Sequence, residues 1–132
     1  MIIRVTPDAK RTKSILKQAE KRLQFTKTIT DKQFSTIIAE SYYEIIKELI
    51  SALFLINGYK AIGENSHKEM IESIAKYSFS GKDIYIIDDL RKKRNKSLYE
   101  GKQIPYIYIE QKRVYLMRII KKLKIIIDKK ML

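Results

Sequence analysis

The chain has 132 residues and a mass of 15.6 kDa, which predicts a single domain over residues 1–132. It contains no cysteine and one histidine, so disulfide scaffolds, thiolate zinc sites, cysteine nucleophiles and histidine-rich metal sites are excluded. Four glycines and two prolines are too few for the many turns of a β-sandwich or barrel, and the composition therefore predicts an all-α protein.

The charge is strongly positive and unevenly distributed. Lysine and arginine total 28 against 15 aspartates and glutamates, a formal net charge of +13. Residues 1–30 carry eight basic and two acidic side chains and residues 81–132 carry fifteen and six, whereas residues 31–80 carry five and seven. Basic ends around a near-neutral middle favour a polyanionic partner such as RNA, DNA or an acidic protein. The alternative is compositional, since AT-rich genomes encode chains rich in Ile and Lys.

No segment is typical of a membrane span or a secretion signal. The longest uncharged apolar stretch, Leu49 to Ile56, is about one third of the length that a membrane span requires. Arg4, Asp8 and Lys10 interrupt the apolar start of the chain, which excludes a signal-peptide core there. We therefore expect a soluble, cytoplasmic protein with no membrane partner.

Five helices are expected, and the first two carry the clearest signals. The first begins at Thr6-Pro7-Asp8, where Thr can cap, Pro suits the first helical position and Asp complements the helix N-terminus; it ends near Thr28. Before it, Ile2-Ile3-Arg4 is expected to be extended but too short for a sheet. The second follows a capping-box pattern at Thr30-Asp31-Lys32-Gln33, keeps an apolar period near 3.6 for about seven turns, and ends at Asn57-Gly58.

Three further helices follow. The third begins at Ser66-His67-Lys68-Glu69 and the fourth after Ser80-Gly81-Lys82-Asp83, both capping-box patterns. Gly101 closes the fourth, and the fifth runs from about Pro105 to the C-terminus. Short connections favour antiparallel neighbours, so the expected fold is an up-and-down bundle of four to five helices. The positions expected on the inward stripes are Ile15, Leu16, Ala19 and Leu23; Phe34, Ile37, Ile38, Tyr42, Ile45, Leu49, Ala52, Leu53 and Ile56; Met70, Ile71, Ile74 and Tyr77; Ile84, Ile87, Leu90, Arg94 and Leu98; and Tyr108, Val114, Met117, Ile120, Leu123 and Ile127.

The densest polar run of the chain is the segment 88–101. On a helix, four of its residues share a face, with Arg94 at the margin of that face; they are Asp88, Arg91, Asn95 and Tyr99. An arginine that points into a bundle groove must find a carboxylate, a carbonyl or a phosphate. Arg91, Arg94 and Lys96 are therefore the candidate nucleic-acid contacts. The alternative is an ordinary helix ion pair between Asp88 and Arg91, with the lysines of the run on a solvated face; these are Lys92, Lys93 and Lys96.

Three stretches together resemble the HEPN family, which consists of small all-α domains. Leu90-Arg91-Lys92-Lys93-Arg94-Asn95-Lys96-Ser97-Leu98-Tyr99-Glu100-Gly101 resembles the family's signature helix. Tyr42-Tyr43-Glu44-Ile45-Ile46-Lys47, leading into Gly58-Tyr59-Lys60, resembles its long second helix, and Ser66-His67-Lys68-Glu69-Met70-Ile71 resembles the start of its third. The resemblance covers about residues 8–130.

The resemblance implies a four- or five-helix bundle that forms a homodimer and acts beside a nucleotidyltransferase in toxin–antitoxin pairs. Active members cleave RNA without a metal, using an arginine, a following polar residue and a histidine shortly after them. Arg94 and Asn95 match the first two, and Tyr99 occupies the place of the histidine, so these three are the candidate catalytic residues. A tyrosine hydroxyl, with an ordinary pKa of about 10, is a poor base near pH 7. We therefore expect an RNA- or nucleotide-binding module with little catalysis.

Two other functions stay open. One is a metal-independent ribonuclease toxin in which Arg94, Asn95 and Tyr99 suffice, and the other is a structural bundle whose basic face meets an acidic protein. His67 follows Ser66 at a helix start, where a capping role is easy, and is expected to be structural. The tyrosines are expected in the core or at an interface more than as stacking platforms for bases. No Gly-rich phosphate loop and no metal-ligand cluster is present, so no cofactor and no metal is predicted.

Overall fold

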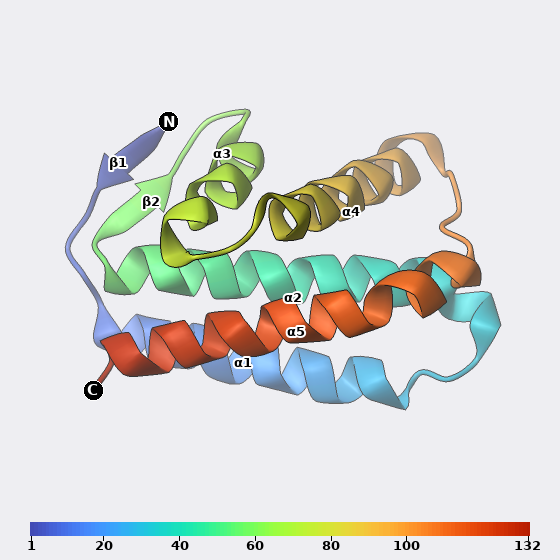
Figure 1. Cartoon of the computed structure of the whole chain (residues 1–132), viewed down its shortest axis with the longest axis horizontal. Coiled ribbons are helices and arrows are strands. Elements are labelled where there is room, and N and C mark those ends of the chain that lie inside the picture. Colours follow the sequence, from blue (N-terminus) through green and yellow to red (C-terminus); the bar gives the residue numbers. More distant parts are fainter.

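The computed structural model describes all 132 residues and confirms the all-α class. Four long helices form an up-and-down bundle: α1 (Ala9–Thr28), α2 (Ser35–Ile56), α4 (Gly81–Glu100) and α5 (Tyr106–Lys130). α1 and α4 run in one direction and α2 and α5 in the other (Figure 1). The short helix α3 (Ser66–Ser73) lies in the connection between α2 and α4 and packs against both, and the 3₁₀ turn η2 (Ile74–Tyr77) follows it. None of these helices combines the length and the apolar character that crossing a membrane requires.

α2 is the central element, because α1, α3, α4 and α5 all pack against it. Twelve of its residues are buried, among them Ile45, Leu49 and Leu53 without any exposed surface. A helix that is apolar on most of its sides is stable in water only when other elements cover it. The wide apolar face of residues 35–56 therefore accounts for a bundle built around this helix.

Several helix starts differ from the sequence expectation by a few residues. α1 begins after Asp8, whose carboxylate accepts a hydrogen bond from the Arg11 amide at 2.9 Å. The carboxylate of Asp31 caps a single 3₁₀ turn, η1 (Lys32–Phe34), so α2 begins at Ser35. At α3 the residue before the helix is Asn65, and Ser66 lies inside the first turn. The residue that precedes the helix is thus two positions after the expected Thr6 in α1, four after the expected Thr30 in α2, and one before the expected Ser66 in α3.

The start and end of α4 agree with the sequence expectation. Ser80 and Asp83 form a reciprocal capping box, with the Asp83 amide 3.1 Å from the Ser80 hydroxyl and the Ser80 amide 3.2 Å from the Asp83 carboxylate. Gly101 follows the helix with φ of +67°, a conformation that glycine adopts without steric cost. Both ends of the helix that carries the polar run are thus fixed by local sequence.

Residues 2–4 do form a sheet, contrary to the sequence expectation. β1 (Ile2–Arg4) pairs antiparallel with β2 (Tyr59–Ala61), and Ile3 lies opposite Lys60. The partner strand follows Gly58, which has φ of +81° and whose missing Cβ would lie 3.0 Å from the carbonyl oxygen of Val5. A larger residue at position 58 would push this N-terminal segment away, so glycine permits the pairing.

Most of the predicted core is buried, but four predicted positions are exposed: Phe34 (42%), Ile37 (52%), Leu98 (56%) and Val114 (76%). Leu98 is eight residues after the buried Leu90, which turns it about 80° off the inward face of α4. On α5 the buried face passes through Leu116 and Ile120 instead of Val114. Phe34 and Ile37 lie around the start of α2, where they line a shallow hollow together with Phe25 of α1.

Candidate nucleic-acid interface

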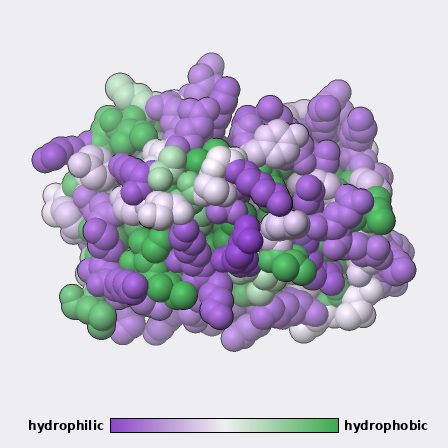
Figure 2. All heavy atoms as spheres, viewed as in Figure 1, coloured by the Kyte–Doolittle hydropathy of each residue, from purple (hydrophilic) through white to green (hydrophobic).

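A basic hollow lies between the C-terminal half of α4 and the loop that leads to α5. Its volume is about 350 Å³, and four lysines line it together with a single carboxylate, that of Asp89. We term it the lysine hollow. The lysines are Lys92, Lys93, Lys96 and Lys102, and the other lining residues are Asn95, Gln103, Ile104 and Pro105. Hydrophilic residues cover most of the surface over α4 (Figure 2).

Helical spacing and the turn after α4 bring the lysines together. Lys96 lies three residues after Lys93 and four after Lys92 on one helix, so its side chain is a neighbour of both. The left-handed turn at Gly101 then directs the chain back, and the Lys102 amide donates a hydrogen bond to the Lys96 carbonyl at 3.3 Å. The fourth lysine therefore returns to the same hollow from beyond the helix end.

The loop wall of the lysine hollow is fastened to the start of α2. The Ser35 hydroxyl donates to the Ile104 carbonyl at 2.6 Å, and the Thr36 hydroxyl accepts from the Ile104 amide at 2.9 Å and donates to the Gln103 side chain at 2.7 Å. Ile104 itself is buried. These contacts satisfy the loop's backbone groups and hold its residues in place opposite α4.

Nearby carboxylates neutralise the lysines only in part. The Nζ of Lys92 lies 3.4 Å from the Asp88 carboxylate, and the Nζ of Lys93 lies 3.7 Å from the Asp89 carboxylate. Lys96 and Lys102 form no ion pair. Exposed pairs of this kind contribute little stability, so an incoming anion can compete for all four ammonium groups. Because the unpaired charges repel one another, an anion in the hollow would also relieve that repulsion.

The two arginines of α4, in contrast, are directed into the protein. The Arg94 side chain is 13% exposed, its guanidinium lies 4.6 Å from the centre of the Tyr43 ring, and its Nη2 lies 4.0 Å from Glu44. Its Nε is buried without a protein hydrogen-bond partner. Stacking of a guanidinium on an aromatic ring is favourable, and Arg94 thereby fastens α4 to α2.

Arg91 forms the helix ion pair that the sequence allowed as an alternative. Its Nε lies 2.8 Å from the Asp88 carboxylate, and its side chain is 17% exposed. Burial alone would raise the pKa of Asp88, but the hydrogen bonds and charges of Arg91 and Lys92 outweigh it and hold that pKa below its ordinary value. Asp88 is therefore ionised at neutral pH and stays paired with the guanidinium of Arg91.

The structure separates the residues that the sequence grouped. Asn95 and Lys96 line the lysine hollow, Arg94 packs on α2, and Tyr99 is 79% exposed near the end of α4. Arg94, Asn95 and Tyr99 thus do not surround one cavity. The sequence placed Lys92 and Lys93 on a solvated face and gave no role to Lys102, whose position depends on the turn at Gly101.

His67 lies beside the same tyrosine that Arg94 covers. Its ring centre is 6.3 Å from that of Tyr43, and it borders a separate cleft between α1, α2 and α3. Burial lowers the pKa of His67, and the charges of Lys47 and Arg94 lower it further. The imidazole is therefore neutral at pH 7 and can donate or accept a hydrogen bond.

Comparisons of the chain with known proteins found no relative. No protein-family model, no curated protein and no solved structure matches the chain. Within the chain, no group of three or more His, Asp or Glu side chains is placed to hold a metal ion. The lysine hollow itself offers four ammonium groups, two amides and one carboxylate.

Proposed function

We propose that the chain is an RNA- or nucleotide-binding module of HEPN type, which acts with a nucleotidyltransferase partner in a toxin–antitoxin-like system and has little catalytic activity of its own. The observation that carries the binding part is the lysine hollow, where four lysines face one carboxylate in about 350 Å³. The HEPN part rests on the sequence resemblance of the helix that forms this hollow.

Phosphate groups suit this hollow for two reasons. Lysine ammonium groups act as point charges that neutralise phosphates without demanding one orientation, and the backbone of a nucleic acid supplies phosphates at regular intervals. The amide groups of Asn95 and Gln103 also line the hollow and can donate hydrogen bonds to base edges. Single-stranded RNA exposes both its phosphates and its base edges, so it can use both kinds of group at once.

The positions of the candidate catalytic residues support the weak catalysis in this proposal. General-base catalysis requires a base within hydrogen-bond reach of the reacting hydroxyl. Tyr99 is exposed, and the Arg94 guanidinium is stacked on Tyr43. A phosphate held in the lysine hollow therefore meets Asn95 but not a converging set of all three residues.

Removal of two lysine charges tests whether RNA binds at the lysine hollow or to positive charge spread over the whole surface. We expect Lys96→Gln combined with Lys102→Gln to weaken the binding of a labelled single-stranded RNA about tenfold, which corresponds to about 1.4 kcal/mol. The matched control is Lys129→Gln with Lys130→Gln, which removes the same charge from the exposed end of α5 and should change affinity less than twofold. Electrophoretic mobility shift measures the affinity, and the same gels show whether the RNA stays intact. Equal losses for the two variants would contradict the proposal.

We extend the proposal to a homodimer, for which exposed apolar side chains provide a surface. Phe25 (66% exposed), Phe34 (42%) and Ile37 (52%) surround a hollow of about 450 Å³, and apolar side chains grouped in this way mark interaction surfaces. Light scattering at micromolar concentration should give twice the 15.6 kDa of one chain, and Phe25→Asp should give a single chain. Val114→Asp, at another exposed apolar position, is the control that should stay dimeric. A wild-type mass of one chain would exclude the dimer.

A further inference from the structure

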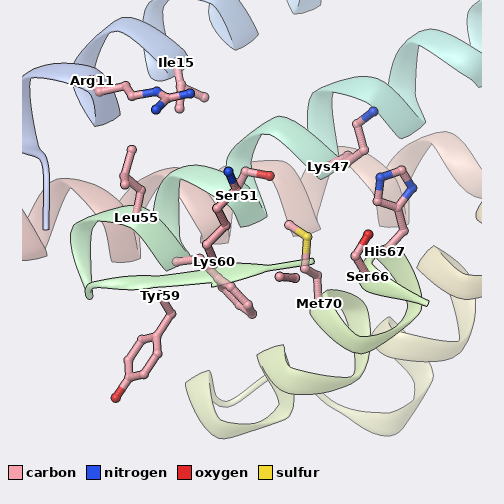
Figure 3. Close-up of a pocket in the computed structure, with 12 residues that line it drawn as sticks. Arg11, Ile15, Lys47, Ser51, Leu55, Tyr59, Lys60, Ser66, His67 and Met70 are labelled. Carbon is pink, nitrogen blue, oxygen red and sulfur yellow. The ribbon is translucent and has the colours of Figure 1, made fainter. Parts of the chain in front are cut away.

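A second cleft lies between α1, α2, β2 and α3, and it shares no residue with the lysine hollow (Figure 3). Its volume is about 270 Å³, and twelve residues line it. We term it the α1–α3 cleft. Its walls bring α1 together with the consecutive elements α2, β2 and α3, so it exists only in the folded chain.

The α1–α3 cleft contains three cations and no carboxylate. Arg11 comes from α1, Lys47 from α2 and Lys60 from β2, and no Asp or Glu is among the lining residues. Lys47 pairs with Glu44 at 3.0 Å, whereas Arg11 and Lys60 form no ion pair. Ser51, Ser66 and His67 add neutral groups that can donate hydrogen bonds. The polar side of this cleft is therefore complementary to a group with more than one negative charge.

Local structure explains why the two unpaired cations are directed here. Arg11 lies in the first turn of α1, where its amide is held by the Asp8 cap at 2.9 Å. Lys60 is the middle residue of β2, and strand alternation exposes it while its neighbours Tyr59 and Ala61 are half-buried. The pairing of β1 with β2 thus sets the position of a cation in this cleft.

Apolar side chains also line the α1–α3 cleft. Six aliphatic, aromatic or thioether side chains from all four elements contribute: Ile15, Phe54, Leu55, Tyr59, Ala61 and Met70. Small-molecule sites commonly combine an apolar lining with a few polar groups that fix the orientation of the ligand. A ligand that combines a highly charged group with an apolar body would contact both kinds of lining residue.

We infer that the α1–α3 cleft binds a phosphate monoester carried on a small aromatic body. A phosphate monoester carries a charge of about −1.5 to −2 at pH 7, which matches the two unpaired cations better than the single charge of a carboxylate does. The cleft is slightly smaller than the roughly 300–1,000 Å³ of typical ligand pockets, so a body of about one ring fits. A free small phosphate and the 5′-phosphorylated end of an RNA share this chemistry.

Titration calorimetry with phenyl phosphate tests the inference. We expect binding that Arg11→Gln and Lys60→Gln each weaken about tenfold, because each removes a charge-assisted hydrogen bond. Both residues are exposed, so these variants should fold. Lys13→Gln removes an equally exposed charge from α1 outside the cleft and should leave the affinity unchanged. Benzoate, which has the same ring and a single charge, should bind at least tenfold more weakly than phenyl phosphate.

The inference is overturned if phenyl phosphate does not bind, if benzoate binds equally well, or if Lys13→Gln weakens binding as much as Arg11→Gln. A competition experiment distinguishes the two sources of the phosphate. If a 5′-phosphorylated RNA trinucleotide displaces phenyl phosphate and its 5′-hydroxyl counterpart does not, the ligand of the cleft is an RNA end. If phenyl phosphate binds and neither trinucleotide displaces it, the ligand is a free small phosphate. The Lys96→Gln, Lys102→Gln variant should keep its affinity for phenyl phosphate, so the failure of one site is distinguishable from the failure of the other.

Discussion

Leu90→Ala is expected to lower the free energy of unfolding by about 3 kcal/mol, whereas Leu98→Ala should change it by less than about 0.5 kcal/mol. Both leucines lie on α4, two turns apart, and the sequence pattern assigned both to the core. In the structure Leu90 has no exposed surface and Leu98 is 56% exposed. Truncation of Leu90 removes apolar contacts and leaves a cavity against α2 and its neighbours, while truncation of Leu98 leaves only a smaller side chain in water.

Urea unfolding followed by circular dichroism measures both changes, and the two variants control one another because they make the same chemical change on the same helix. Equal destabilisation by the two would mean that α4 is rotated from the orientation seen here. That result would also remove the lysine hollow, because Lys92 and Lys96 face outward only when Leu90 faces inward.

The helices themselves follow from local signals that the sequence displays. The Ser80–Asp83 capping box, the glycine after α4 and the long apolar period of residues 35–56 each act within a few residues of their own position. The β1–β2 pair could not be found in this way, because β1 has three residues and its partner is more than fifty residues away. Its formation depends on Gly58 and on the tertiary contact with Val5.

The candidate site was only partly predictable, for a related reason. Sequence spacing identifies Lys96 and Asn95 as neighbours on one helix, but it cannot show that Arg94 stacks on Tyr43, more than fifty residues away. Nor can it show that Ser35 and Thr36 hold the loop that brings Lys102 to the same hollow. Some cations of α4, such as Arg94, are held by contacts with α2, and others, such as Lys96, stay at the surface. Only the folded chain shows which of them are available to a ligand.

The affinity for single-stranded RNA should fall steeply with salt if the lysine hollow is the binding site. Neutralisation of phosphates by its four lysines predicts a slope of log K against log salt of about −2.8, and hence a loss of about 50-fold between 50 and 200 mM salt. The Lys96→Gln, Lys102→Gln variant leaves two of these charges, so its slope should fall to about −1.4 and its loss to about sevenfold. Lys129→Gln with Lys130→Gln should keep the wild-type slope, since those side chains lie at the end of α5. Fluorescence anisotropy at five salt concentrations yields all three slopes. If the slope became shallower by the same amount in both variants, the binding would be due to the net charge of +13 and not to the hollow. Only a localised site distinguishes one pair of lysines from another.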